Sequence, residues 1–395
     1  MQLGLVGGLA LSLALCACSG DDSRKTGAAN SLSLATLNNA IGVGLAPYAP
    51  QRLDAIIDDL PGLGADVLCL QELWQPDDMD RLTLALARDY PYTHRAVQAT
   101  GGAASAACTN AEADSLLGCL NEHCADVDQE GLPLCAIASC ADVFTAVSMG
   151  CQQCVVANQG AADVQHLVQI CSAADGEAAS YQDQNGLLLL SKLPLEEPDF
   201  LRLESSLGDR GVLSARIDTG VAGAVRVYCT HLAATLSEVP YRGPYSSWQG
   251  ERVEQIERWL DWVEETRSSA DVAVLMGDLN CGPETAQAHG ASPDAYARFV
   301  DAGFEDPYAD DDGRCTFCGS NPLNVAVGDP DEGAEIDHIL FSDAASSLTS
   351  PAGSLPRTVA RVFDQPIEIE DGGNSIETAH SDHYGVQVTL SRARP

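Results

Sequence analysis

Basic residues are scarce in this chain. Lys and Arg number 21 against 57 Asp and Glu, which gives 21 − 57 = −36 as the formal net charge at pH 7. The basic residues are scattered singly along the sequence. A protein that coats nucleic acid releases counterions through clustered Lys and Arg, so this composition argues against that role. An acidic surface instead favours solubility and the retention of divalent cations.

Long apolar runs are absent after residue 18, so no later stretch is predicted to cross a bilayer. Residues 1–18 are almost wholly apolar and are followed at once by a polar segment. A buried core helix is one interpretation, but the position favours an export signal, although no Lys or Arg precedes the run. Leu15-Cys16-Ala17-Cys18 resembles a bacterial lipobox. We therefore expect lipidation of Cys18, a polar tether over 19–30, and a protein that is anchored on the cell envelope or secreted.

Cysteine is abundant, with 15 residues, of which eight lie between Cys108 and Cys171. This density in an exported chain predicts a disulfide framework. Zinc is the competing interpretation, because Cys151-x-x-Cys154 and Cys315-x-x-Cys318 have the spacing of metal ligands. Neither motif has a clean second pair, which favours disulfides. Pairing cannot be deduced from the sequence, although bonds 119/124, 135/140 and 151/154 would tie neighbouring helices.

Strand-like and helical runs alternate over 31–99 and resume over 181–395, which predicts one α/β domain. The expected strands cover 31–38, 67–70, 186–191, 211–217, 225–229, 272–276, 336–341 and 384–390, and the expected helices cover 52–60, 77–90 and 250–266. Residues 100–180 differ, since they are rich in Ala, Cys, Gln and Asp and have helical spacing around 111–124, 134–149 and 155–171. We predict a disulfide-stapled helical insertion there.

Five of the apolar runs carry polar residues at one end. These are Gln71-Glu72, Thr230-His231, Gly277-Asp278-Leu279-Asn280, Asp337 and Ser381-Asp382-His383. A buried strand cannot end in a carboxylate or an imidazole unless it stops at a cleft or the group is paired. Together these residues supply the groups needed for a hard metal ion and for general acid–base chemistry.

Some of these residues would be ordinary alone. Glu72 is then an acidic residue at a helix start, and Asn38 is a turn residue. Strand alternation puts Asp278 and Asn280 on one face, which packing alone does not explain. A lone buried histidine is usually structural, but His231 lies at a strand exit before a polar loop.

The C-terminal residues form the clearest pair of a carboxylate and an imidazole. Asp382 and His383 are adjacent, and Asp337 is available to orient an imidazole as a hydrogen-bond acceptor. His338 follows Asp337 directly, so it should face the opposite side of its strand. We therefore expect His338 to be structural.

An ordered set of motifs resembles the endonuclease/exonuclease/phosphatase superfamily. The set is, in this order, Asn38, Gln71-Glu72, Thr230-His231, Gly277–Asn280, Ile336-Asp337 and Ser381–His383. The resemblance spans 31–390 apart from the insertion. It implies an α/β fold that is a four-layer αββα sandwich, with two packed mixed β-sheets flanked by helices. It also implies hydrolysis of a phosphate ester with Mg²⁺ or another hard divalent cation. The protein is then a metal-dependent phosphoric diester hydrolase.

The resemblance also implies roles for single residues. Glu72, with Asn38 and Asp382, would hold the metal. Asp278 would orient or activate the attacking water. Asn280 would position a phosphate oxygen. His383, oriented by Asp337, would act as a general base or stabilise the transition state, and His231 would donate to phosphoryl oxygens; the division between the two histidines stays open.

Within the superfamily, the chain resembles the sphingomyelinase-like branch most. The motifs are Gln71–Trp74, Tyr90–Tyr92, Asp209–Leu213, Thr230–Leu232 with Tyr245, Arg252 and Gln255, and more weakly Cys315–Leu323. We expect Arg210, Tyr245 and Trp248 to contact the substrate. Aromatic residues are only 5% of the chain, yet three lie within 239–248. Such a cluster suits a membrane interface, and packing on the scaffold explains it equally well.

Three functions remain open. The first is an exported phospholipid phosphodiesterase, a monomer that meets membrane through its lipid anchor and aromatic loop. The second is an extracellular deoxyribonuclease-like endonuclease, which the acidic balance disfavours unless a local basic groove overrides it. The third is a surface module that binds a partner through the insertion. In an enzyme, the insertion would instead cap or widen the substrate entrance or form a rigid surface decoration. A complete set of polar motifs argues against the third.

Overall fold

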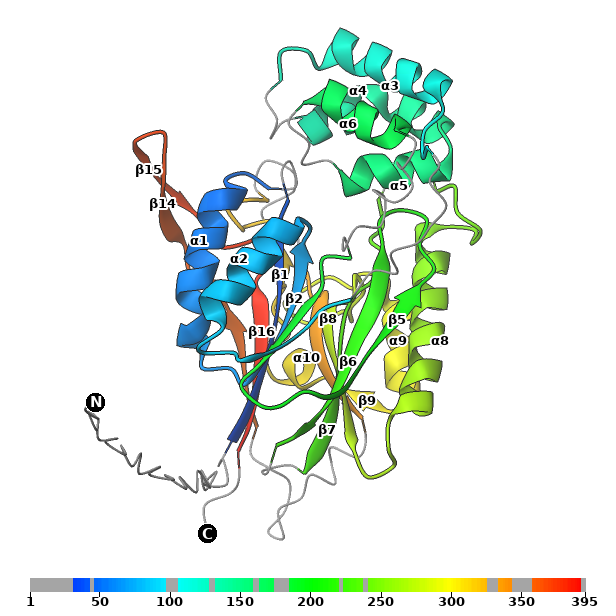
Figure 1. The fold of residues 1–395 in the computed structure, drawn as a ribbon. Coiled ribbons are helices and arrows are strands. Elements are labelled where there is room, and N and C mark those ends of the chain that lie inside the picture. Colours follow the sequence, from blue (N-terminus) through cyan, green and yellow to red (C-terminus); the bar gives the residue numbers. More distant parts are fainter. Residues whose placement is uncertain are drawn as a thin grey trace, which may run out of the picture.

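Two six-stranded sheets pack face to face at the centre of the protein (Figure 1). The computed structural model describes residues 31–42, 46–96, 106–127, 132–158, 163–173, 185–219, 223–236, 241–324, 333–342 and 357–391. The first sheet contains, in spatial order, β13 (Arg357–Val362), β16 (Gly385–Ser391), β1 (Ser31–Ile41), β2 (Val67–Leu73), β4 (Leu188–Ser191) and β3 (Tyr92–His94). The second contains β5 (Glu196–Leu203), β6 (Arg210–Asp218), β7 (Ala224–His231), β8 (Val272–Asp278), β12 (Asp337–Ser342) and β9 (Phe304–Glu305).

Both sheets are mixed. Each contains one parallel pair, β1 with β2 and β7 with β8, and the other neighbours are antiparallel. The carboxyl ends of β1, β2, β7 and β8 meet at one edge of the sandwich, where Asn38 of β1 donates to Asp278 of β8 across the two sheets. The four parallel strands thus deliver their last residues to one place.

Apolar side chains fill the space between the sheets and the outer layers. Val67 and Leu189 of the first sheet meet Val227 and Val274 of the second, and all four are fully buried. Helices α1 (Ala49–Asp59) and α2 (Pro76–Leu86) cover the outer face of the first sheet, and α8 (Trp248–Thr266) and α9 (Pro293–Asp301) cover that of the second (Figure 1). These four layers confirm the expected αββα sandwich.

A disulfide joins the two sheets directly beneath the shared edge. Cys69 of β2 bonds Cys229 of β7, at a sequence separation of 160. Because Glu72 and His231 follow these cysteines by three and two residues, the covalent link lies close to both. The chain-entropy argument assigns about 5 kcal/mol of stabilisation to a loop of this length.

Four helices lie between β3 and β4 in the sequence and gather beyond one end of the sheets (Figure 1). They are α3 (Asn110–His123), α4 (Leu132–Ala146), α5 (Met149–Ala157) and α6 (Val164–Ser172). Disulfides 108–151, 119–140, 124–135 and 154–171 staple them. Gln153 of α5 donates to the carbonyl of Ser205, in the loop that leads into β6. The helices therefore contact the same end of the sandwich as the edge described above.

The structure corrects several boundaries and pairings. The expected helix over 155–171 is two helices, and the suggested bonds 119/124, 135/140 and 151/154 are wrong, because each of these cysteines pairs with a more distant one. Cys315 and Cys318 bond each other, so the zinc interpretation fails there. β2, β7 and β8 continue through Glu72, His231 and Asp278 instead of stopping before them, and β1 extends beyond Asn38 to Ile41, since neighbouring strands pair with these segments.

Shorter elements complete the chain. They are η1 (Leu60–Leu63), α10 (Pro307–Asp311), the pair β10 (Phe317–Cys318) and β11 (Gly333–Ala334), and the hairpin β14 (Ile367–Asp371) and β15 (Asn374–Thr378). Within the described ranges, no helix combines the length and apolarity that a bilayer span requires. The expected signal, tether and lipidation site at Cys18 lie outside the described residues.

Candidate active site

Glu72 and Asp278 face each other across the two sheets, and Asn38 joins them. The amide nitrogen of Asn38 donates to Oε1 of Glu72 and to Oδ2 of Asp278, each at 3.0 Å. Its amide oxygen accepts from the main-chain N–H of Ala40 at 3.0 Å. In this orientation Asn38 holds two carboxylates together and directs its nitrogen at them, whereas the sequence predicted an oxygen ligand.

Backbone irregularities bring these groups into position. The register between β1 and β2 shifts just after Asn38. Glu72 has a positive φ of 56°, which few non-glycine residues adopt. Gly186 approaches it so closely that a Cβ there would lie 3.2 Å from the Glu72 Cα. Such local strain concentrates at functional sites.

Burial and charge raise the pKa of both carboxyls. Burial raises the pKa of Asp278 to about 7, and the Asp337 carboxylate adds to this effect. Burial followed by the charge of Asp382 raises the pKa of Glu72. Two neighbouring carboxyls that resist ionisation mark a place where a cation would be favourable.

His231, the last residue of β7, points at both carboxylates. Its Nε2 lies 3.4 Å from Oδ2 of Asp278 and 3.8 Å from Oε1 of Glu72. Arg210, at the start of β6, donates from Nη1 to His231 Nδ1 over 3.2 Å. Burial and the Arg210 charge hold the pKa of His231 well below its usual value. The ring is therefore neutral, with its proton on Nε2, ready to donate.

His383 and Asp337 form the other half of the cluster. Nδ1 of His383 donates to Oδ2 of Asp337 at 2.8 Å, and its Nε2 lies 3.9 Å from Oδ2 of Asp278. Burial lowers the pKa of His383, but the carboxylates of Asp337, Asp278 and Asp382 outweigh burial and hold it well above its usual value. His383 is thus a cation at neutral pH, with Nε2 directed toward Asp278.

The donor set fits a divalent metal ion. One oxygen or nitrogen atom each from Glu72, His231 and Asp278 lies within 4.8 Å of the others, and the same is true of Asp278, Asp337 and His383. In addition, Oδ1 of Asp337 is buried without a hydrogen-bond partner among the described residues. Carboxylate oxygens around an unsatisfied negative charge are the ligands of a hard cation.

Asn280 and Asp382 lie at the border of this cluster. The Asn280 N–H donates to Oδ1 of Asp278 at 2.9 Å, and its side chain donates to the carbonyl of Leu232 at 3.0 Å. β8 ends at Asp278, and Asn280 has a φ of 50°. Strand alternation therefore does not set the direction of the Asn280 side chain relative to that of Asp278. Asp382 accepts from the hydroxyl of Ser381 at 3.2 Å and acts on Glu72 through its charge.

Two of the expected substrate contacts point elsewhere. The hydroxyl of Tyr245 donates to Glu204 at 2.6 Å. The ring of Trp248 packs edge-on against Tyr241, with centroids 5.0 Å apart, and is 9% exposed. Arg210 alone of the three expected residues contacts the cluster.

Sequence reasoning overlooked Trp74. Its indole nitrogen donates to Oε2 of Glu72 at 3.3 Å, its ring lies 6.1 Å from that of His231, and Arg210 lies 5.4 Å from its centre. It thus supports three members of the cluster at once. Its place in the Gln71–Trp74 motif, two residues after Glu72, was the available signal.

Comparisons with known proteins bear on the family and the fold. Residues 41–383 match the endonuclease/exonuclease/phosphatase family. No curated protein sequence matches the chain. The fold is similar to sphingomyelinase C from Streptomyces griseocarneus, with 18% identity and a TM-score of 0.56 over 92% of this chain and 99% of that one.

Two further solved structures share the fold. A double mutant of beta toxin from Staphylococcus aureus, with bound magnesium ions, has 15% identity and a TM-score of 0.52 over 92% of this chain and 100% of the toxin. A truncated TDP2 from Caenorhabditis elegans has 15% identity and a TM-score of 0.50 over 91% of this chain and 97% of that one. At these identities the similarities show the fold alone.

Proposed function

The chain belongs to the endonuclease/exonuclease/phosphatase family and is a metal-dependent phosphodiester hydrolase, and we propose that its substrate is a phosphocholine-type lipid. The enzyme would thus be a sphingomyelinase-like phosphodiesterase that uses Mg²⁺. The observation that supports this proposal most is a buried cluster of functional groups with one arginine, Arg210, beside it. The cluster comprises Glu72, His231, Asp278, Asp337 and His383. This cluster contains donors and acceptors for one phosphodiester group.

The polar groups divide into those that stabilise charge and those that handle protons. When bound, Mg²⁺ would polarise the phosphoryl group and stabilise its developing negative charge. His231 would donate a hydrogen bond from its Nε2–H to a phosphoryl oxygen, and Arg210 would add positive charge beside it. Asp278 would orient the attacking water and accept its proton, for which a pKa of about 7 is well suited. His383 would protonate or stabilise the leaving oxygen.

Charge favours a zwitterionic substrate. The protein carries −36 at pH 7, so a polynucleotide is repelled at long range. A phosphocholine head group has no net charge, and its quaternary ammonium is attracted to an acidic surface. The similarity in fold to sphingomyelinase C supports the same substrate class.

We place the enzyme outside the cytoplasm, tethered through a lipid on Cys18. Six disulfides support an oxidising compartment. A lipid tether would keep the active site close to a membrane that contains its substrate. Tyr245, which is partly exposed, would then contact the bilayer surface instead of the phosphodiester, whereas the buried Trp248 would support the loop from within.

The test uses the soluble protein without residues 1–20. It is incubated with vesicles of sphingomyelin or phosphatidylcholine and with plasmid DNA, in each case with Mg²⁺ and with EDTA. We expect release of phosphocholine from vesicles, loss of that release in EDTA, and recovery when Mg²⁺ is restored. Glu72→Ala should abolish release while the protein keeps its melting temperature.

Other outcomes point to other functions. Mg²⁺-dependent cleavage of DNA with strong salt sensitivity, and no lipid cleavage, would replace the lipid substrate by a polynucleotide. Absence of cleavage of any phosphate ester, together with binding to a partner that is lost on deletion of 100–180, would favour a surface binding module.

A further inference from the structure

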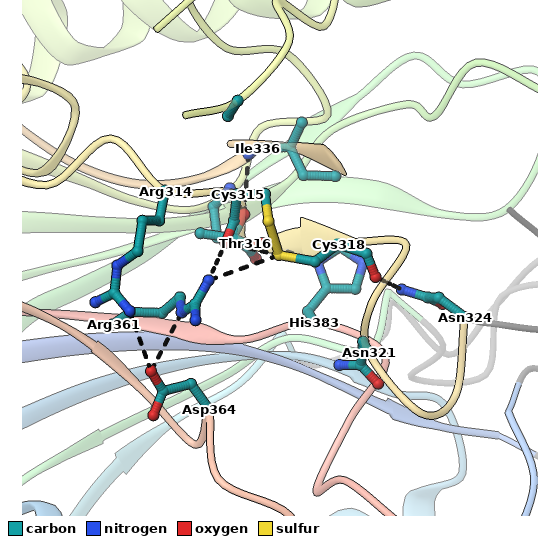
Figure 2. Close-up of a disulfide and its surroundings, with 12 residues drawn as sticks. Arg314, Cys315, Thr316, Cys318, Asn321, Asn324, Ile336, Arg361, Asp364 and His383 are labelled. Atoms are coloured by element: carbon teal, nitrogen blue, oxygen red, sulfur yellow. Dashed lines mark hydrogen bonds and ion pairs between the residues drawn. A yellow bond between two sulfur atoms is a disulfide. The ribbon is translucent and has the colours of Figure 1, made fainter. Parts of the chain in front are cut away.

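A short loop beside the active site contacts both strands that carry the Asp337–His383 pair. It comprises residues 315–324, and a disulfide between Cys315 and Cys318 closes its first turn (Figure 2). Thr316, between the two cysteines, is 0% exposed. We call this segment the positioning loop.

Thr316 binds the main chain on both sides of the pair. Its hydroxyl oxygen accepts from the N–H of Ile336 at 3.0 Å and from the N–H of Asp337 at 3.1 Å. Its carbonyl accepts from the N–H of Tyr384 at 2.8 Å. Asp337 opens β12 and Tyr384 directly precedes β16, so one residue connects the starts of two strands that belong to different sheets.

Two asparagines of the same loop fix the segment before His383. Asn321 donates from its side chain to the carbonyl of Ser381 at 2.9 Å and is 0% exposed. Asn324 donates to the carbonyl of Asp382 at 2.9 Å and to that of Cys318 at 3.2 Å. The bonds to Ser381 and Asp382 satisfy carbonyls of the segment that leads to His383. Together with the bond from Tyr384 to Thr316, they hold the main chain on both sides of His383.

The ring of His383 also packs on the loop. Its centroid lies 4.9 Å from that of Phe317, and the two residues form an isolated β-bridge. The loop therefore limits both the main chain and the imidazole plane of His383. A hydrogen bond between Asp337 and His383 depends on both.

The disulfide fixes the loop against its neighbours. Gly333 of β11 passes it so closely that a Cβ there would lie 2.7 Å from the Cβ of Cys315. Arg361 donates to the carbonyl of Cys315 at 3.1 Å (Figure 2). A glycine and an arginine from two other strands thus hold the disulfide in place.

We propose that residues 315–324 align Asp337 with His383 for catalysis, and that Thr316 is the principal positioning residue. This inference rests on the proposed hydrolytic function. Thr316 does not touch the reacting atoms; it acts through the main chain of Asp337 and Tyr384. The Thr316 hydroxyl must accept from the N–H groups of Ile336 and Asp337, so a side chain of the same shape without a hydroxyl should not align the pair.

The test compares Thr316→Val, which keeps the shape and removes the hydroxyl, with Thr316→Ser, which keeps the hydroxyl. Thr285→Val is the matched control, because the Thr285 hydroxyl also accepts from two main-chain N–H groups, those of Gln287 and Ala288. With bis(4-nitrophenyl) phosphate and Mg²⁺, we expect Thr316→Val to lower kcat roughly 10- to 100-fold with KM unchanged. Thr316→Ser and Thr285→Val should keep kcat within about 3-fold.

A substrate-free measurement separates this inference from the proposed function. The Nδ1–H proton of His383 is followed by NMR and assigned by its loss in His383→Ala. We expect its resonance to shift or broaden in Thr316→Val and to match the wild type in Thr316→Ser and Thr285→Val. Should Thr316→Val not fold, Asn324→Ala is expected to give the same shift.

The outcomes decide between the two claims. An unchanged resonance, or an unchanged kcat, in folded Thr316→Val overturns the positioning role. If the resonance shifts in Thr316→Val but the wild-type protein cleaves no phosphodiester, the alignment by the loop is supported and the proposed function is rejected.

Discussion

Two pairs of a histidine and a carboxylate lie on opposite faces of β12. On the inner face, His383 donates to Asp337 at 2.8 Å, and on the outer face Nδ1 of His338 lies 2.6 Å from Asp306. Both histidines are buried. Carboxylates outweigh burial at both and raise the pKa of His338 to about 9 and that of His383 well above its usual value. By distance, burial and charge the two pairs are alike.

They differ in what remains available for a substrate. Nε2 of His338 is 2.9 Å from the carbonyl of Cys281, so both ring nitrogens have partners in the scaffold. Nε2 of His383 makes no hydrogen bond within the described residues and faces Asp278. A histidine–carboxylate pair therefore marks an active site only when one nitrogen stays free and other functional groups converge on it.

The largest expected effect comes from removing the free nitrogen. We expect His383→Ala to lower kcat roughly 100- to 10,000-fold, because general acid–base groups contribute that much. The free energy of unfolding should also fall, because the buried Asp337 carboxylate loses its partner. Phosphodiester hydrolysis and urea unfolding measure the two quantities. Near-normal activity in this variant would contradict the assignment.

Breaking the outer pair should lower stability without lowering activity. Asp306→Asn leaves a buried imidazolium without its main partner, and we expect the free energy of unfolding to fall by about 3 kcal/mol. The kcat of the folded protein should stay within about 3-fold of the wild type. A large loss of kcat with unchanged stability would show that the two faces are not separate in function.

Stability should also depend on pH through His338. Its pKa is about 9 in the folded protein against 6.5 ordinarily, so its contribution is complete below pH 6.5 and is lost as pH rises through about 9. We expect the free energy of unfolding to decrease by about 1–3 kcal/mol over this range. The decrease should be smaller in His338→Gln. Equal slopes in the two proteins would show that His338 does not carry the dependence.

The smallest effect is expected at Glu335, which lies 3.4 Å from His338 and whose carboxyl oxygens accept no hydrogen bond within the described residues. Burial raises its pKa to about 8, so it is protonated at neutral pH. A carboxyl whose pKa is raised on folding costs stability above its ordinary pKa of 4.5, so Glu335→Gln should raise the free energy of unfolding at pH 7 and raise it further at pH 9. Marked destabilisation at pH 7 would indicate that the carboxylate is ionised.

Local patterns in the sequence predicted much of the fold. Apolar runs of strand length and amphipathic helices were sufficient to predict the two sheets and their helical layers, because burial of alternate residues is a local requirement. Short strands such as β3 and β14, and the division between α5 and α6, left no comparable pattern. The disulfide partners were also out of reach, since Cys69 and Cys229 meet only after the sheets pack.

By itself the sequence determined which residues supply the chemistry, because carboxylates and imidazoles beside apolar runs are costly unless they have partners. It did not determine how these residues are oriented. Asn38 directs its nitrogen at Glu72 and Asp278, and Trp74 supports Glu72, only because the two sheets meet at this edge. Orientation depends on contacts between residues far apart in the chain, and such contacts exist only in the tertiary structure.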